Sequence, residues 1–377
     1  MRRISTWIWD SFLALKATGT AANIALAAAA ILVCLAVAEI ALRTFSSIGP
    51  RSGHFEPETA FENELTPRTA VFAANYSGVL TSRDFEIPYE LNSLGFRERE
   101  LDFKELSRNR PYLFTGDSYF HGWGVERDAR ISERFAAILQ SDSVEAEVLN
   151  LAFPGFGTYQ YLDILKLYAE KINPRLVIIG FFIGNDFLDD IATTKRGRRS
   201  DRQDEKFLQL YTHDIKALLR AFLRSSPLVN MARYSLWEIE FFRYFFAKLS
   251  IENDRIILYK REDSLLQDTF YSATFAAFEE IAKFAQRREF SLLVVLVPDH
   301  LQILKPELFA QYDFDKPQKK LTRHLEKLGI PHLDLSSEFL FFERPQELYF
   351  REDKHWTAKG HEFAADLLFK YVQAEKN

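Results

Sequence analysis

The sequence predicts an α/β domain built on a mainly parallel sheet with helices on both faces. Five short apolar runs, each bounded by turn residues, have the length and composition of strands. The runs Leu176–Ile183 and Ser291–Val297 are apolar almost throughout, which is what strands covered on both faces require. Helical stretches separate the runs, and alternation of strand and helix favours a parallel sheet.

The elements follow one another along the chain from residue 111 onward. The predicted strands are Tyr112–Thr115, Ala146–Ala152, Leu176–Ile183, Ser291–Val297 and His332–Leu335. The predicted helices are Ile131–Gln140, Tyr159–Lys171, Thr269–Arg288, Pro317–Leu328 and Gly360–Gln373. Residues 43–110 form a mixed lead-in, in which the alternation of Thr81–Leu94 predicts a hairpin. We interpret Asn92–Arg97 as a turn closing that hairpin and assign it no chemistry.

Composition excludes several classes of protein. The chain has 377 residues, 47% of them apolar and 35 of them Phe, which is ample for a large core in one domain with insertions or in two domains. A net charge of −5 gives no reason to expect a nucleic-acid partner. The single cysteine, Cys34, rules out an intrachain disulfide and says nothing about the compartment.

Neither a metal nor a cofactor is predicted. The eight histidines fall singly, without His-Glu-x-x-His or paired-cysteine spacing. The glycines from Gly116 to Gly124 do not form a Gly-x-Gly-x-x-Gly nucleotide-binding motif.

The N-terminal region predicts a transmembrane signal anchor at residues 17–42. The 22 residues from Ala17 to Ala38 carry no charge, and as a helix they would span about 33 Å, enough for a bilayer core of about 30 Å. Arg2, Arg3 and Lys16 precede the segment. By the positive-inside tendency they keep residues 1–16 cytoplasmic and place the rest of the chain outside, in a bacterial periplasm.

Two other interpretations of this segment stay open. Ala36-Val37-Ala38 has the small-x-small form of a signal-peptidase site, so the segment could be removed. The other interpretation is a buried helix of a soluble domain, which the high alanine content favours. Cys34 follows Val33 rather than a small residue, which argues against lipoprotein processing. Both the anchor and the cleaved signal place the main domain outside the cytoplasm.

Four separated blocks carry residues suited to chemistry. The first is Gly116-Asp117-Ser118, where a serine follows a predicted buried strand, the position at which open α/β sheets present functional groups. The others hold Asn150 to Gly157, Gly180 to Asp186 and Asp353 to His361. Each block alone is a weak signal, since Ser118 could be an ordinary helix cap.

Together and in this order, the four blocks resemble those of the SGNH, or GDSL-type, serine hydrolases. The family is named for a serine, a glycine, an asparagine and a histidine in four blocks, and the chain resembles a membrane-anchored bacterial member. The resemblance covers residues 111–377. It implies a flavodoxin-like three-layer sandwich with a five-stranded, mainly parallel sheet.

Acyl transfer by a serine needs a base, and the candidate base is His355. A serine hydroxyl is a poor nucleophile at neutral pH, and a histidine has a suitable pKa for taking its proton. The imidazole in turn needs a carboxylate to fix its tautomer. Asp353 is the predicted partner, although the commonest family spacing, Asp-x-x-His, would place the acid at Glu352. Alternative roles are a helix cap for Asp353 and a core histidine for His355, and His361 is interpreted as structural.

The resemblance also implies the oxyanion hole, the set of donors that meets the negative charge of the tetrahedral intermediate. Its members would be the backbone N–H groups of Ser118 and Gly155 and the side-chain amide of Asn185. Gly157 could replace Gly155, since the Pro-Gly-Phe-Gly turn offers both glycines. Asn185 could instead serve only in an Asn-Asp turn.

Residues 189–268 do not fit the alternation and are interpreted as a helical insertion. Its basic run, Lys195–Arg199, is typical of a solvated loop, with contact to anionic lipid as the alternative. The aromatic stretch Tyr234–Leu249 is interpreted as a packed helix. The sharper hypothesis is a lid or membrane-facing cap over the active site, lined by Trp237, Phe241, Phe242, Phe245 and Phe246.

The sequence therefore predicts an extracytoplasmic, membrane-anchored SGNH-type esterase that hydrolyses carboxylic esters through an acyl-serine intermediate. Its ester substrate would include acyl groups, acetyl among them, on an envelope or exported polysaccharide. The Asp-x-His-Trp-Thr form at Asp353 resembles SGNH-type proteins that handle acetyl groups on exopolysaccharides, but in those the serine follows the histidine. The alternatives are an O-acyltransferase, a non-catalytic assembly protein of a polysaccharide system, and a lipase acting at the bilayer.

Overall fold

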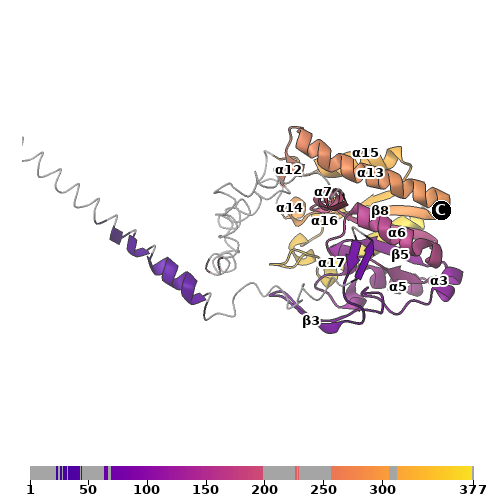
Figure 1. The fold of residues 1–377 in the computed structure, drawn as a ribbon, viewed down its shortest axis with the longest axis horizontal. Helices are drawn as coiled ribbons and strands as arrows, with labels where there is room; N and C mark the ends of the chain where they lie inside the picture. Colours follow the sequence, from indigo (N-terminus) through magenta and orange to yellow (C-terminus); the bar gives the residue numbers. More distant parts are fainter. Residues whose placement is uncertain are drawn as a thin grey trace, which may run out of the picture. The chain divides into compact units, whose positions relative to one another are not determined.

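The structure is a computed structural model, and it describes residues 63–66, 69–197, 256–304 and 312–375, residues 226 and 228, and part of the stretch 23–44. The chain divides into two compact units. One unit consists of Met1–Arg51 and Phe207–Arg243, and the other of Ser52–Lys206 and Tyr244–Asn377. The second unit contains the sheet and is shown with its labelled helices in Figure 1.

The sheet has five parallel strands, which confirms the predicted α/β fold. The strands are β5 (Tyr112–Gly116), β6 (Val148–Asn150), β7 (Leu176–Phe182), β8 (Ser291–Val297) and β9 (His332–Asp334). Their spatial order is β6-β5-β7-β8-β9, and every neighbouring pair is parallel. This is the flavodoxin-like order 2-1-3-4-5, in which the chain changes direction across the sheet between β5 and β7.

The strands separate two apolar cores, one on each face of the sheet. Leu113, Val177 and Val294 point into a core shared with α6 (Thr158–Ile172), α13 (Leu265–Arg288) and α15 (Lys316–Lys327). The alternate residues Phe114, Ile178 and Val295 point into a core shared with α5 (Ile131–Ser141) and α17 (Ala358–Ala374). Because successive strand side chains alternate between faces, an apolar run supplies both cores at once. Figure 1 shows α13 and α15 on one side of the sheet and α5 on the other.

The five predicted helices are all present, with shifted ends. The largest shift is in α13, which begins at Leu265 rather than Thr269. Ser264 caps it: the Ser264 hydroxyl accepts the Gln267 N–H at 3.2 Å, and the Gln267 side chain accepts the Ser264 N–H at 3.1 Å. This reciprocal capping box starts the helix one turn earlier than its apolar pattern suggests.

Several short elements complete the described part of the second unit. They are α3 (Phe103–Asn109), α4 (Ser118–His121), η1 (Arg127–Ala129), α7 (Asp186–Gly197), α12 (Ile256–Tyr259), α14 (His300–Ile303), α16 (Ser336–Leu340), η3 (Pro345–Leu348), β1 (Asn63–Thr66) and β2 (Thr69–Val71).

The predicted hairpin exists but lies four residues earlier than expected, and it is closed by residues 82–85, so the prediction that Asn92–Arg97 closes it is wrong. It pairs β3 (Ser77–Thr81) with β4 (Glu86–Glu90) in antiparallel register. The chain leaves β4 because the side-chain oxygen of Asn92 accepts the N–H groups of Leu94 and Phe96, both at 3.0 Å. An asparagine that bonds to the backbone ahead of it replaces the strand by a turn.

A pair of glycines lets α4 sit directly on the ends of two strands. Gly116 of β5 and Gly180 of β7 are neighbours in register. A Cβ atom on Gly116 would lie 2.8 Å from the Gly180 carbonyl oxygen and 2.9 Å from the Phe120 Cβ, and a Cβ on Gly180 would overlap the Phe120 ring. Any larger residue at either position would push α4 away from the sheet.

The first unit is described only in part. Residues 33–42 are helical, and the Glu39 carboxylate accepts hydrogen bonds from the Ser226 hydroxyl (2.7 Å) and the Leu228 N–H (3.2 Å). Within the described residues, no helix is both long and apolar enough to cross a membrane. Much of the predicted anchor and the aromatic stretch 234–249, with its five proposed lid residues, lie outside the described residues.

The core beneath α17 contains one histidine without hydrogen-bond partners. His361 is fully buried against the edge of Trp356, and neither of its ring nitrogens has a partner. Burial, with smaller contributions from His355 and nearby arginines, lowers the pKa of His361 to about 3. The folded protein therefore keeps this imidazole neutral at a pH where the unfolded chain would protonate it.

This difference predicts that replacing His361→Phe will stabilise the protein more in acid than at neutral pH. At about pH 5 this histidine is protonated in the unfolded chain and neutral in the folded chain. The difference lowers the free energy of unfolding of the wild type by about 2 kcal/mol. At about pH 7.5 that cost has vanished, since the pH is above both pKa values. Denaturant titrations of both proteins at the two pH values measure the difference. The effect of the substitution on packing is the same at both pH values and cancels when the two stability changes are subtracted. An equal stability change at both pH values would therefore contradict the prediction.

Candidate active site

Ser118 is the first residue of α4, immediately beyond the end of β5. The Asp117 side chain caps the helix by accepting the Tyr119 N–H at 2.9 Å, and Gly122 ends it in a left-handed conformation with φ of 78°. A glycine adopts this conformation without strain, so the helix stops after one turn. The nucleophile candidate is thereby fixed at the carboxyl edge of the sheet, where ligands bind in open α/β folds.

A hydrogen-bonded chain joins Ser118 to the C-terminal block. The His355 Nε2 atom lies 2.8 Å from the Ser118 Oγ atom, and the His355 Nδ1 atom contacts the Asp353 carboxylate. Because Nδ1 donates its proton to the carboxylate, Nε2 is the nitrogen that can accept the serine proton. Of the two carboxylates that the sequence offered, Asp353 contacts the imidazole, whereas Glu352 lies 3.8 Å from Arg83.

Asp353 stays ionised despite its partial burial. Burial alone would raise the pKa of Asp353, but the hydrogen bond and charge of His355, together with a hydrogen bond from Trp123, lower it below its ordinary value. A negative charge beside Nδ1 favours the imidazolium that would form when His355 takes a proton.

A single residue separates the acid from the imidazole, and it has an unusual conformation. Lys354 has φ of 72°, a left-handed geometry that costs a residue with a side chain about 1–2 kcal/mol. This turn lets Asp353 fold back onto the ring of His355. Tyr119 holds the turn from the serine side: its hydroxyl donates to the Lys354 carbonyl at 3.0 Å, and its ring lies 4.9 Å from the His355 ring.

The candidates for the oxyanion hole follow the two strands beside β5. Gly155 lies in the loop after β6 with φ of 74°, and the space beside its Cα atom is open. Asn185 lies in the turn between β7 and α7, and its side-chain oxygen has no hydrogen-bond partner. Parallel neighbouring strands bring their carboxyl ends to one edge, so topology places both residues on the same edge as Ser118.

Gly157, the alternative to Gly155 in the oxyanion hole, has a structural role instead. Its N–H donates to the Gln160 side chain at 3.1 Å, at the start of α6. A Cβ atom there would lie 2.8 Å from an oxygen of Asp190. The glycine is thus required by the helix start and its close contact with α7, and its N–H is already engaged.

A buried histidine behind the serine was not predicted as part of the site. His121 accepts the Tyr89 hydroxyl on Nε2 at 2.5 Å and donates from Nδ1 to the Ala152 carbonyl at 3.0 Å. Burial, reinforced by the charge of Arg97, lowers the pKa of His121 well below its ordinary value. The neutral imidazole therefore ties together β4, α4 and the loop that leads to Gly155.

Arg97, which the sequence analysis placed in a turn without chemistry, fastens the loop after α4. Its guanidinium donates to the carbonyls of Gly122 (2.9 Å) and Val125 (2.8 Å), and it is almost fully buried. Burial and the nearby charge of Arg130 lower its pKa to about 10, so the group remains a cation at neutral pH. The loop between these two carbonyls carries Trp123, the residue beside Asp353.

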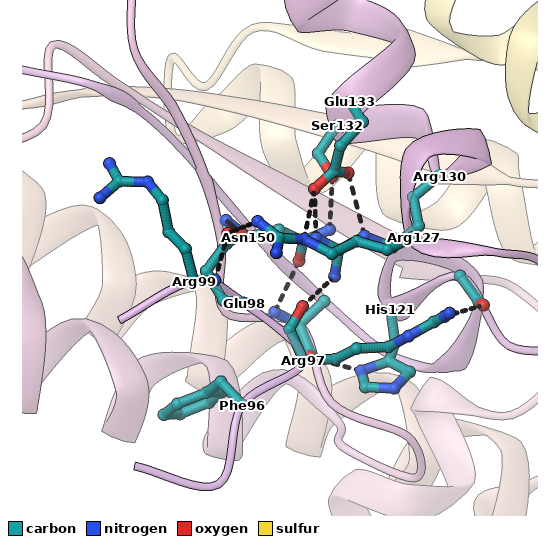
Figure 2. A network of polar contacts seen from close by, with 12 residues as sticks. Phe96, Arg97, Glu98, Arg99, His121, Arg127, Arg130, Ser132, Glu133 and Asn150 are labelled. Atoms are coloured by element: carbon teal, nitrogen blue, oxygen red, sulfur yellow. Dashed lines mark hydrogen bonds and ion pairs between the residues drawn. The ribbon is translucent and has the colours of Figure 1, made fainter. Parts of the chain in front are cut away.

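Figure 2 shows the polar network that surrounds Arg97. Arg130, fully buried, donates to the Arg97 carbonyl at 2.6 Å and pairs with Glu98 and Glu133. Glu98 also accepts the Asn150 N–H at 3.0 Å, at the end of β6. Arg130 is compensated by the charges of Glu98 and Glu133, whereas Arg97 is compensated by two backbone carbonyls, so both buried cations have hydrogen-bond partners. The sequence gives only a weak signal for this network. The signal is the charged run after Phe96, whose composition is equally typical of a solvated loop.

A buried carboxyl supports the turn that carries Asn185. Burial and the nearby charge of Asp117 raise the pKa of Asp186 well above its ordinary value. One of its oxygens accepts the Tyr161 hydroxyl at 2.8 Å and the Phe182 N–H at 2.9 Å. These bonds connect α6 to the end of β7 at the base of the turn.

Among the described residues, no group of three or more His, Cys, Asp or Glu side chains is arranged to hold a metal ion.

The family comparison matches the C-terminal part of the chain. Residues 258–377 match the family model described as SGNH hydrolase-like domain, acetyltransferase AlgX. The C-terminal part of this chain is therefore similar to an SGNH hydrolase-like domain. The matched stretch includes Asp353 and His355, whereas Ser118, Gly155 and Asn185 precede it. A comparison with curated proteins gives no match.

Solved structures similar to the chain include several esterases. An acetyl xylan esterase, AlAXEase, is 14% identical, with 70% of this chain and 99% of that one covered and a TM-score of 0.41. The psychrotrophic esterase EstA from Pseudoalteromonas sp. is 10% identical, with 71% and 99% covered and a TM-score of 0.39. A lipase/acylhydrolase from Enterococcus faecalis is 11% identical, with 70% and 96% covered and a TM-score of 0.39.

The contact between Tyr89 and His121 predicts an effect on stability. Replacing Tyr89→Phe removes the donor to a fully buried ring nitrogen, and the unsatisfied nitrogen should lower the free energy of unfolding by about 1–3 kcal/mol. Denaturant titration near neutral pH measures this change. The control is the same Tyr89→Phe change in a His121→Leu background, where the tyrosine hydroxyl has no ring nitrogen to bond. Tyr89→Phe should cost less there than in the wild type, and an equal cost in the two backgrounds would refute the interpretation.

Proposed function

We propose that this protein is a serine esterase that hydrolyses carboxylic esters through an acyl-serine intermediate. The observation that carries the proposal is the hydrogen-bonded chain from Ser118 through His355 to Asp353, with 2.8 Å between the serine oxygen and Nε2. This is the arrangement of nucleophile, base and orienting carboxylate that acyl transfer to a serine requires.

The first half of the reaction forms the acyl-enzyme. His355 Nε2 takes the hydroxyl proton while Ser118 Oγ attacks the ester carbonyl carbon, giving a tetrahedral intermediate with a negative oxygen. The imidazolium is stabilised by the Asp353 carboxylate. As the carbon–oxygen bond to the alcohol breaks, His355 returns the proton to the leaving alcohol.

The second half repeats these steps with water. His355 removes a proton from water, the resulting hydroxide attacks the acyl carbonyl, and Ser118 leaves with its proton restored. In both halves the proposed donors to the oxyanion are the N–H groups of Ser118 and Gly155 and the Asn185 amide. Each such donor is typically worth about 10²–10³ in rate.

An O-acyltransferase is the second candidate, because the matching family model is described as an acetyltransferase. The acyl-serine would form in the same way, and a sugar hydroxyl would then replace water as the acceptor. The substrate class that we propose for either reaction is acyl groups, acetyl among them, on an envelope or exported polysaccharide. The pattern Asp353-Lys-His355-Trp-Thr supports it by resemblance to proteins that handle such groups.

We also propose that the N-terminal segment anchors the protein and that the SGNH domain lies outside the cytoplasm. The uncharged run from Ala17 to Ala38 and the positive charges before it support this placement. So do the apolar side chains of Ile31, Val37 and Ile40, which are 59%, 60% and 63% exposed.

Esterase activity should depend on both ends of the hydrogen-bonded chain. With p-nitrophenyl acetate and the full-length protein in mild detergent, Ser118→Ala and His355→Ala should each lower kcat by at least about 10³-fold, since the first lacks the nucleophile and the second lacks the base that activates it. A fluorophosphonate should label the wild type and not Ser118→Ala. A folded wild type with neither turnover nor labelling would rule out the hydrolase and favour a non-catalytic assembly protein. Transfer of the acyl group to an added polysaccharide, at the expense of hydrolysis, would favour the transferase.

The two neighbouring carboxylates should differ sharply in their contribution to turnover. Asp353→Asn leaves His355 without its anionic partner and should lower kcat by about 10³–10⁴-fold. Glu352→Gln should change kcat less than about threefold, because this side chain faces Arg83 on the protein surface. The same ester assay compares the pair, which are matched in chemistry and adjacent in sequence. A loss in Glu352→Gln as large as or larger than that in Asp353→Asn would contradict the assignment of Asp353 as the partner of His355.

A further inference from the structure

We propose that Asp84, at the tip of the β3–β4 hairpin, is a positioning residue for the Asp353–His355 loop. A single oxygen of its carboxylate, Oδ2, accepts the backbone N–H groups of Glu352 and Asp353, each at 2.7 Å. The donors lie 268 and 269 residues further along the chain. The inference rests on the esterase function proposed above, because it concerns the loop that holds the acid and the base.

The loop needs support from outside itself. Only Lys354 separates Asp353 from His355, and its left-handed backbone is disfavoured for any residue with a side chain. Within the loop, the His355 N–H reaches the Asp353 carboxylate at 3.4 Å, which is long for a hydrogen bond. Without further contacts, the loop could relax and turn Asp353 away from the imidazole.

Asp84 and Tyr119 hold the loop from two different elements. Asp84 fixes the N–H groups before Lys354, and the Tyr119 hydroxyl fixes the Lys354 carbonyl at 3.0 Å. Tyr119 follows Ser118 in α4, so this bond also ties the loop to the nucleophile. One oxygen that accepts two consecutive N–H groups restrains both peptide groups at once, which suits Asp84 to oppose the backbone strain.

The tip of the hairpin is itself well fixed. The Ser82 N–H donates to the Phe85 carbonyl at 2.7 Å, and the Asp84 N–H donates to the Ser82 hydroxyl at 3.0 Å. The Phe85 ring packs on Phe350 with 5.2 Å between ring centres. A Cβ atom on Gly124 would lie 2.7 Å from each of these two rings, so the loop after the nucleophile closes against the same contact.

These contacts predict an effect on proton transfer rather than on substrate binding. Asp84 touches the backbone that presents Asp353 and has no contact with Ser118 among the described residues. Its loss should therefore lower kcat and leave KM nearly unchanged, which is the pattern of an interaction that matters in the transition state.

The test compares Asp84→Ala with Asp84→Asn in the full-length protein in detergent, using p-nitrophenyl acetate. Asp84→Ala should lower kcat by about 10–100-fold with KM within about twofold. Asp84→Asn keeps an oxygen that can accept both N–H groups and should stay within about threefold of wild type. Glu86→Ala, an exposed carboxylate of the same hairpin, is the control and should leave both constants unchanged.

A second measurement does not depend on turnover. In protein labelled with ¹⁵N-histidine, the Nδ1 proton of His355 should give a far-downfield resonance, which Asp84→Asn should retain and Asp84→Ala should lose. A folded Asp84→Ala with wild-type kcat and an unchanged resonance would overturn the proposal, even if it melted at a lower temperature. Wild-type protein that shows the resonance but no turnover dependent on Ser118 would refute the esterase function and leave the positioning role of Asp84 standing.

Discussion

The close approach of α4 to the sheet is the constraint on which the rest of the site depends. Two adjacent strands have no side chain where they meet the helix, at Gly116 and Gly180, and the ring of Phe120 fills that space. The turn after β5 is therefore so tight that Ser118 comes only two residues after the strand's last residue. The position of the serine is set by backbone packing, and the loop that carries His355 has to be held at a matching place.

Many of the contacts that fix these loops come from the residues before the sheet, 77–97. Tyr89 bonds to His121, Arg97 fastens the loop after α4, and Asp84 fixes the backbone before Lys354. Each of these bonds joins segments well separated in the chain, and each ends on a group within or beside the Ser118–His355–Asp353 chain. The sheet supplies the edge on which the reactive groups lie, and the lead-in supplies polar contacts that limit how these groups can move.

The sequence was a good guide wherever a local pattern has a local physical cause. The apolar runs predicted all five strands, and Ser291–Val297 to the residue, because a strand buried on both faces is apolar almost throughout. The start of α13 was missed since a capping box depends on two specific side chains rather than on apolar spacing. Asp353 was predicted as the partner of His355 against the commoner family spacing, and the left-handed backbone of Lys354 is what brings its carboxylate to the imidazole. Arg97 was assigned no chemistry because its partners are backbone carbonyls, which leave no mark in the sequence.

The separation between the serine and its base has a consequence for how the protein is made. The contact between Ser118 and His355 spans 237 residues, so a growing chain exposes the serine long before the imidazole is synthesised. With neither base nor orienting carboxylate present, the serine remains as unreactive as an ordinary alcohol. Under the proposed esterase function, an incomplete chain would therefore lack the ability to attack esters. The proposed reactivity would begin only when the segment that carries His355 has folded against the segment that carries Ser118.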